Sequence, residues 1–287
     1  MHVEPVHPLF VGRVADLDLT QSLGAEDARA LHAALGRYGA LVIHTPPLTD
    51  RQFEAFGAGL GPLFDTSSGF RGSERVIRIG NVDTQGRLLP EGHHSREANV
   101  ANDLWHVDNT FSEPPAMYSA LMALTVPPEG GETEFADARA AYDDLPQQRK
   151  AALDGLITEH SFIYSRSLTG YTQFSPAQRA QLPSRRRLLV KTHPETGRKA
   201  LILSSHIERI VGRPDEEGRA LLSELTDFAT RPKYVYSHHW QCGDIVIYDN
   251  RSVLHRARPY ATFTYARDMR ALRVLDGPDP DRVCVPH

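Results

Sequence analysis

The stretch CGDIVIYDNRSVLHRARPY, residues 242–260, contains the pattern that decides the fold. Its run Ile245–Tyr248 is almost wholly apolar, which predicts a short buried strand. Asp249 and Asn250 then form a polar turn, and His255 lies at the start of the next strand. Two strands joined by a short polar turn indicate a β-rich core that carries a histidine.

Similar strand-like runs occur on both sides of a helical region, and helices are predicted between them. Apolar stripes at helical spacing predict helices over 26–38, 137–156 and 215–229, and a capping-box pair, Thr49 and Gln52, predicts another. We therefore predict one domain over residues 1–287, mainly β with helices: a double-stranded β-helix (jelly-roll) core flanked by α-helices, with a helical and loop insert between about 137 and 185. The strand-like runs are residues 40–44, 75–82, 104–111, 117–126, 187–193, 200–206, 234–240 and 267–275.

The composition is that of an ordinary globular protein of 287 residues, with 40% hydrophobic and 24% charged residues. A formal net charge of −4 offers no electrostatic reason to expect nucleic acid or a membrane surface as partner. Two cysteines, Cys242 and Cys284, are too few for a disulfide framework and fit a reducing compartment. With neither a signal-peptide pattern nor a membrane-length apolar run, we expect a cytoplasmic enzyme or binding protein.

The stretch LWHVDNTF, residues 104–111, places His106 and Asp108 two residues apart. In a strand, both side chains would point to one face, and a buried carboxylate there needs a cation or another partner. The alternative is that Asp108 turns the chain with Asn109 while His106 is solvated. In a chain with 14 histidines, a bare H-x-D favours that alternative.

A third residue, His255, changes this balance. Two histidines and one carboxylate, with the other positions open, are the ligand set of non-haem Fe(II) oxygenases. The open positions allow a cosubstrate and O₂ to bind together, which a closed structural site does not. Arg267 follows His255 by twelve residues, and a guanidinium is a suitable bidentate partner for a carboxylate cosubstrate. The pairs His93-His94 and His238-His239 are interpreted as loop and surface-strand residues instead of ligands.

Four segments resemble the Fe(II)/2-oxoglutarate-dependent dioxygenases of the taurine dioxygenase/2,4-dichlorophenoxyacetate dioxygenase family. They are LWHVDNTF, PPEGGETEFADARAAYDDLP, THPETGRKALIL and GDIVIYDNRSVLHRARPY, and the resemblance extends over nearly the whole chain. It implies that His106, Asp108 and His255 bind Fe(II). It also implies that Thr133 and Arg267 hold the distal carboxylate of 2-oxoglutarate.

The chemistry that this resemblance implies is oxidative decarboxylation of 2-oxoglutarate to succinate and CO₂, with O₂ as oxidant and hydroxylation of a small-molecule substrate. In related halogenases a small residue replaces the carboxylate ligand so that halide can bind, so Asp108 favours hydroxylation. The resemblance further implies a homo-oligomer, either a dimer or a tetramer.

The position of the substrate anchor departs from the family pattern. Family members that act on taurine or aryloxyacetates usually have a second arginine four residues after the cosubstrate arginine, where this chain has Ala271. Arg270 and Arg273 flank that position, and strand alternation favours Arg273, although about 20 Å of strand separates it from Arg267. The alternative is that both flanking arginines are surface residues. Asn102 matches a family position near the substrate, but it is also typical of a simple turn former.

Three functions are therefore considered. The leading hypothesis is hydroxylation of a small organic acid, aromatic or aryloxyalkanoate-like, with ether cleavage. The second keeps the same chemistry on a sulfonate, sulfate ester or biosynthetic intermediate. The third is a non-catalytic metal-binding barrel that senses a ligand. The segments 63–75 and 88–98 are predicted to be long loops, which often bind ligands or cover a site.

Overall fold

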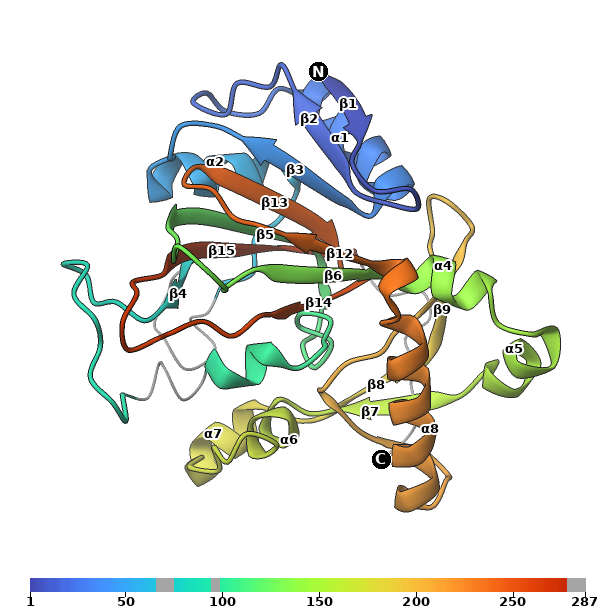
Figure 1. The fold of residues 1–287 in the computed structure, drawn as a ribbon. Coiled ribbons are helices and arrows are strands. Elements are labelled where there is room, and N and C mark those ends of the chain that lie inside the picture. The colour runs from blue at the N-terminus through green and yellow to red at the C-terminus, as the bar shows by residue number, and fades with distance from the viewer. Residues whose placement is uncertain (66–74, 94–98, 278–287) are drawn as a thin grey trace.

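Two facing β-sheets form the centre of the molecule (Figure 1). The computed structural model describes residues 1–65, 75–93 and 99–277, so parts of both long loops, His94 and Cys284 lie outside the described residues. The larger sheet has seven strands in the order β1-β2-β3-β13-β5-β15-β4, and only the β2/β3 pair is parallel. These strands are His2–Pro5, Gly12–Ala15, Ala40–His44, Asp244–Asp249, Ala116–Thr125, Asp268–Leu275 and Ile77–Gly80 in that order.

The smaller sheet has the antiparallel order β12-β6-β14, with strands Val235–His238, Thr133–Asp137 and Val253–Ala257. A buried cluster lies between the two sheets, because it joins Val246 and Ala271 of the large sheet to Phe135 and Val253 of the small one. Two facing sheets with helices outside confirm the predicted jelly-roll core.

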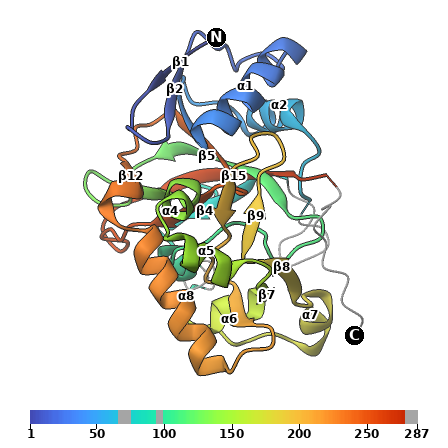
Figure 2. The ribbon, with the colours of Figure 1, turned by 90° about the vertical axis from the view of Figure 1, so that its right-hand side faces the viewer.

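Helices α1 (Ala25–Tyr38) and α2 (Asp50–Leu60) cover the outer face of the large sheet (Figures 1 and 2). The capping box of Thr49 and Gln52 is present at the start of α2, as predicted. Phe53 of α2 is fully buried in a cluster that includes Leu272 of β15. This packing leaves the opposite face of the sheet for the site.

The segment that follows β6 is less regular than predicted. The helix expected over 137–156 is two short helices, α4 (Ala138–Asp143) and α5 (Gln147–Leu153), because Pro146 lacks an N–H donor and disfavours helical geometry just before it. The predicted helix at 215–229 is confirmed as α8 (Asp215–Ala229), which packs on β11. The remaining elements are η2 (Val100–Asp103), β7 (Ile157–His160), α6 (Phe162–Ser167), α7 (Pro176–Gln181), β8 (Arg185–Leu188), β9 (Val190–Thr192), β10 (Lys199–Leu201), β11 (Ile207–Ile210) and η3 (Pro232–Tyr234).

The strand predicted over 104–111 is wrong. Only His106 forms a bridge, to His255, and the chain then turns at Asn109, whose φ is +51°. Asparagine tolerates this left-handed conformation better than most residues do. The turn described by the alternative interpretation is therefore present, yet it leads His106 and Asp108 into the interior.

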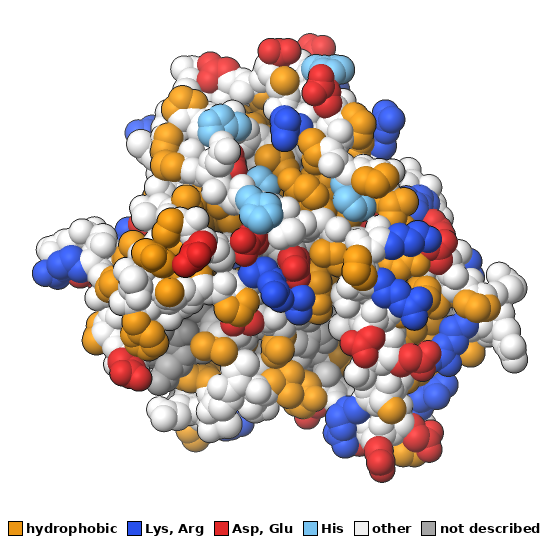
Figure 3. Space-filling view, viewed as in Figure 1, with side chains coloured by type: hydrophobic (Ala, Val, Ile, Leu, Met, Phe, Trp, Pro, Cys, Tyr) orange, Lys and Arg blue, Asp and Glu red, His pale blue; other side chains and the backbone are white. Residues whose placement is uncertain are grey.

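On the face shown in Figure 3, positively and negatively charged side chains are interspersed among hydrophobic ones. Within the described parts of the chain, no helix combines the length and the apolar character needed to span a membrane.

Candidate metal and cosubstrate site

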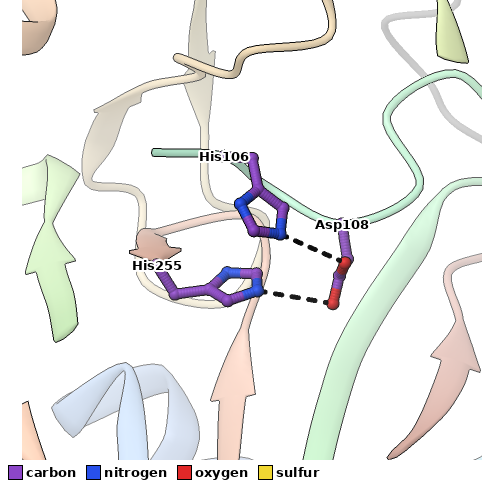
Figure 4. Close-up of side chains that lie close together, drawn as sticks. All are labelled: His106, Asp108 and His255. Carbon is purple, nitrogen blue, oxygen red and sulfur yellow. Dashed lines mark ion pairs between the residues drawn. The ribbon is translucent and has the colours of Figure 1, made fainter. Parts of the chain in front are cut away.

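His106, Asp108 and His255 converge at one buried point (Figure 4). The Nε2 atoms of His106 and His255 lie 3.8 and 3.7 Å from the two carboxylate oxygens of Asp108. Reciprocal backbone hydrogen bonds of 3.0 and 2.9 Å join His106 to His255. Two segments that are distant in sequence are thus fixed to each other at the residues expected to bind metal.

Both histidines are neutral, as metal ligands must be. Burial lowers the pKa of His106, and burial together with neighbouring His106 lowers that of His255 to about 3. The Nδ1 atom of His106 lies 2.7 Å from the carbonyl oxygen of Leu104 and donates to it, so Nε2 keeps its lone pair for a metal.

Asp108 is held as a carboxylate by several donors. Burial alone would raise its pKa, but the guanidinium of Arg273, helped by the hydrogen bond from Ser119, holds the pKa well below the usual range. The hydroxyls of Ser119 and Tyr248 donate to Oδ2 at 2.8 and 3.1 Å, and Arg273 donates to Oδ1 at 3.2 Å. The backbone N–H of Asp108 donates to Asn250, which fixes the turn as well as the side chain.

Thr133 and Arg267 line the same small cavity as the three candidate ligands. Thr133, at the start of β6, is buried, and its hydroxyl accepts a hydrogen bond of 3.0 Å from the indole of Trp240. Arg267 is buried as well, and its Nε has no hydrogen-bond partner among the described residues. Burial lowers the pKa of Arg267, but a guanidinium keeps its charge at neutral pH, so this group needs an anion.

Asn81 anchors the backbone at Arg267. Its Oδ1 accepts from the Arg267 N–H at 2.8 Å, and its Nδ2 donates to the carbonyl oxygens of Thr262 and Tyr265 at 2.7 and 2.8 Å. At the preceding Gly80, an added Cβ would lie 2.1 Å from the carbonyl oxygen of Arg267, so this close strand approach requires glycine. Strand β4 and the loop before β15 are thereby tied together at the arginine.

A larger cavity of about 330 Å³ is also lined by His106 and Asp108. Its lining combines apolar and aromatic side chains with several polar and charged ones. Arg273 and Asn102 border both this cavity and the small one. The other aromatic and charged residues around it are Phe64, Phe111, Phe162, His206, Glu113, Arg166 and Arg185.

The structure separates the two candidate anchors on β15. Arg273 points into the site, as strand alternation predicts, and it lines the same small cavity as Arg267 because two long side chains converge there. The candidate Arg270 is wrong as a site residue: it bonds Asp50 of α2 at 2.8 Å and also Asp268 on the outer face. Ala271 packs in the core between the sheets.

The pair His238-His239 was predicted to be exposed, which holds only for His239. His238 is buried, and its Nε2 lies 3.0 Å from a carboxylate oxygen of Asp244. The strand pattern could not show this because Asp244 lies on the next strand. Neither histidine is part of the metal cluster.

A profile of the taurine catabolism dioxygenase TauD, TfdA family matches residues 2–274. The chain belongs to this TauD/TfdA family. It is 41% identical over 279 residues to the alpha-ketoglutarate-dependent 2,4-dichlorophenoxyacetate dioxygenase of Cupriavidus pinatubonensis, covering 95% of this chain and 96% of the relative. It is 37% identical over 256 residues to the (S)-phenoxypropionate/alpha-ketoglutarate-dioxygenase of Sphingobium herbicidovorans, covering 86% of each.

The crystal structure of AAD-2 in complex with Mn(II) and N-oxalylglycine is similar to this TauD/TfdA member along the whole chain. The TM-score is 0.90 and the identity 37%, with 100% of this chain and 99% of the other covered. The chain is therefore a 2-oxoglutarate-dependent dioxygenase that uses Fe(II) and O₂.

The donor set of this TauD/TfdA member fits Fe(II). Two neutral imidazoles and one ionised carboxylate converge in the interior, and both cavities border them. Among the described residues, no second group of three His, Cys, Asp or Glu side chains meets this geometry. When bound, the iron supplies the activation of O₂.

His206, Phe111 and Phe162 are the site residues that sequence reasoning missed. His206 is buried edge-on to His106, with ring centroids 6.1 Å apart, and its Nδ1 has no hydrogen-bond partner within the described chain. Burial, and then His106, hold its pKa well below the usual value, so the ring is neutral. His206 ends a predicted strand, which was a usable signal, whereas nothing in the sequence marks Phe162.

Proposed function

We propose that this dioxygenase hydroxylates an aryloxyalkanoic acid at the carbon between the ether oxygen and the carboxylate. Relatives are named for 2,4-dichlorophenoxyacetate and (S)-phenoxypropionate, which are acids of this kind. One oxygen atom of O₂ enters the substrate as hydroxyl, and the other enters succinate as 2-oxoglutarate loses CO₂. The hydroxylated product is a hemiacetal that collapses to a phenol and an oxo acid, so the ether bond is cleaved.

The position of Arg273 is the observation that carries this proposal. One Nη atom bonds Asp108 at 3.2 Å, while its Nε is buried without a hydrogen-bond partner among the described residues. A substrate carboxylate that binds this guanidinium lies beside the candidate metal ligands. The carbon next to that carboxylate is then the part of the substrate nearest to the metal.

The aromatic lining of the larger cavity supports an aryl group at the other end of the substrate. The rings of Phe111 and Phe162 are 5.0 Å apart, and the ring of His206 lies 4.7 Å from Phe111. Such a cluster binds an aromatic ring through apolar contact and edge-to-face packing. The neutral His206 adds one polar group, suited to a hydrogen bond with an ether oxygen or a carboxylate.

We assign roles to the remaining residues on the same basis. His106, Asp108 and His255 hold Fe(II), while Ser119 and Tyr248 fix the carboxylate. Thr133 and Arg267 bind the distal carboxylate of 2-oxoglutarate. Asn102, where the cavities meet, contacts the substrate.

A sulfate ester or sulfonate is the second candidate substrate. The chain is 28% identical over 287 residues to an alpha-ketoglutarate-dependent sulfate ester dioxygenase of Pseudomonas putida, and Arg273 suits a sulfate oxygen as well as a carboxylate. The aromatic lining favours the aryloxyalkanoate. The ligand-sensor interpretation is not retained, because the relatives are enzymes and a sensor needs no open oxygen site.

An anaerobic titration tests the metal and cosubstrate roles. Fe(II) and 2-oxoglutarate added together are expected to produce a visible charge-transfer band, and His255→Ala should abolish it. A colourless wild-type complex would refute the assignment of this cavity.

Succinate release then identifies the substrate. Aryloxyalkanoates, alkyl and aryl sulfonates and sulfate esters are compared with fixed 2-oxoglutarate, and phenol release confirms ether cleavage. Turnover of sulfate esters alone would replace the leading candidate with the second. Homo-oligomerisation and a cytoplasmic location stay predictions.

A further inference from the structure

The indole of Trp240 is hydrogen-bonded to the hydroxyl of Thr133. Its Nε1 lies 3.0 Å from Oγ1, and Trp240 is two residues beyond the end of β12. Thr133 is 2% exposed and borders the small cavity together with Arg267. Trp240 does not line that cavity, so it can act on a bound molecule only through Thr133.

The direction of this hydrogen bond decides what Thr133 can do. An indole N–H is only a donor, so it occupies a lone pair of the threonine oxygen. A threonine hydroxyl has one hydrogen, which the indole leaves free to point elsewhere. In the buried cavity beside Arg267, the complementary acceptor is an anionic oxygen.

We propose that Trp240 is a positioning residue that turns Thr133 into a hydrogen-bond donor toward the distal carboxylate of 2-oxoglutarate. This inference rests on the proposed cosubstrate role of Thr133 and Arg267. Without the indole, the Thr133 hydroxyl is free to rotate. When its hydrogen points away, the hydroxyl oxygen faces the carboxylate and the two oxygens repel each other. Arg267 supplies the positive charge for the carboxylate, and Trp240 sets the direction of the hydrogen bond that Thr133 donates to it.

The surroundings of Trp240 hold the indole in place. The ring of His238 meets it edge-on, with centroids 4.5 Å apart at 89°. Because the Asp244 carboxylate is an acceptor, the Nε2 of His238 donates to it at 3.0 Å. The same carboxylate accepts the backbone N–H of Gln241 at 2.8 Å and lies 2.7 Å from Nδ1 of His44. One buried carboxylate therefore fixes both the turn after Trp240 and the histidine against it.

The register of the small sheet links these groups further. His238 of β12 is the strand partner of Thr133 of β6. The side chain that supports the indole and the hydroxyl that the indole orients are thus on paired residues, which limits their relative movement.

The test is anaerobic binding of 2-oxoglutarate to the Fe(II)-loaded protein, measured as Kd from the charge-transfer band. Calorimetry of N-oxalylglycine binding to the Mn(II)-loaded protein gives an independent Kd. Trp240→Phe removes the N–H and keeps an aromatic ring, and it should raise Kd on the order of 10-fold. Thr133→Val should raise Kd at least as much, and adding Trp240→Phe to Thr133→Val should have no further effect.

Two controls distinguish positioning from a general structural role. Tyr236→Phe removes a hydroxyl 3.3 Å from Nδ1 of His238 on the same strand, and it should leave Kd unchanged. Pyruvate lacks the distal carboxylate, so Trp240→Phe should not weaken its binding. If Trp240→Phe unfolds, Asp244→Asn loosens the same turn, and it should weaken 2-oxoglutarate and not pyruvate.

The other possible results each overturn one part of the proposal. An unchanged Kd for 2-oxoglutarate in Trp240→Phe, or an equal loss with pyruvate, would overturn the positioning role. Additive losses in the double variant would overturn it as well. If Thr133→Val binds 2-oxoglutarate like the wild type, the proposed cosubstrate site fails instead.

Discussion

The proposed cosubstrate side and the proposed substrate side of the candidate metal centre are built differently. On the proposed cosubstrate side, the backbone N–H of Arg267 donates to Asn81, and the hydroxyl of Thr133 accepts from Trp240. Three of these four residues lie on or beside sheet strands. On the substrate side, most of the wall comes from η2, α6, the turn at Phe111 and the segment before β8. The strands provide rigid positions, while the helices and connections provide variable ones.

This difference corresponds to what each side binds. The relatives share alpha-ketoglutarate as cosubstrate, but their names give several substrates: a dichlorophenoxyacetate, a phenoxypropionate and a sulfate ester. A constant ligand suits a site fixed by strand register, whereas a variable ligand suits a wall that changes without disturbing the sheets. The comparison therefore predicts that substitutions on the two sides have separable effects.

The largest effect is expected for Arg267→Gln. Hydrogen bonds to charged groups contribute about 1.5–3 kcal/mol each, so losing the guanidinium should raise the KM for 2-oxoglutarate on the order of 100-fold. The KM for the organic substrate should change little. Initial rates of succinate formation, with each reactant varied in turn, measure both constants. Equal changes in both would mean that the two sides are not separable.

Arg273→Gln should have a smaller effect, confined to the other side. Glutamine retains a donor for Asp108 but loses the charge that binds the substrate carboxylate. We expect a KM for an aryloxyalkanoate roughly 10-fold to 30-fold higher, with the KM for 2-oxoglutarate nearly constant. Arg270→Gln on the same strand is the matched control, because Arg270 bonds Asp50 on the outer face. A similar loss in both variants would contradict the role of Arg273.

A third prediction concerns folding stability and the support beneath the proposed substrate side. His160 of β7 bonds Thr110 and Thr158 at 2.9 and 2.8 Å, and burial lowers its pKa from 6.5 to about 3. Below pH 6.5 the unfolded chain binds a proton at this residue that the folded protein does not bind. His160 alone should therefore lower the folding stability by about 1.4 kcal/mol per pH unit as the pH decreases from 6.5 toward 3.

Urea unfolding of the metal-free protein at pH 7 and pH 5 measures this decrease. His160→Gln should reduce the loss between these pH values by about 2 kcal/mol. His239→Gln, at an exposed histidine, is the control and should retain the wild-type decrease. A His160→Gln protein with an unchanged pH dependence would show that His160 is not the group responsible.

Much of the fold could be predicted because its signals are local. The capping box at Thr49 and the apolar stripe of 215–229 depend on neighbours within one helical turn, and both helices are present. The stretch 104–111 was misread because its residue types suit a strand, whereas the structure makes it a turn. Tertiary hydrogen bonds to Asn250 and with His255 hold that turn, and no local pattern contains them.

The candidate site was predictable to the extent that its residues lie in ordered motifs. Strand alternation favoured Arg273 over Arg270 as a site residue, because residues three positions apart on β15 point to opposite faces of the sheet. The contacts of Asn81 and Trp240 were not predictable, because each connects strands distant in the chain. The role of His206 was not predictable for the same reason, because only the fold brings it against His106.

The order of strands in the large sheet has a consequence for biosynthesis. Strands β13 and β15 are late in the chain, yet they lie inside the sheet, between β3 and β5 and between β5 and β4. During translation, β4 and β5 emerge before any of the strands that flank them in the large sheet, and the metal ligand His255 is still absent. A nascent chain should therefore have neither a complete sheet nor an iron site until the last strand leaves the ribosome, so iron loading is expected to follow synthesis.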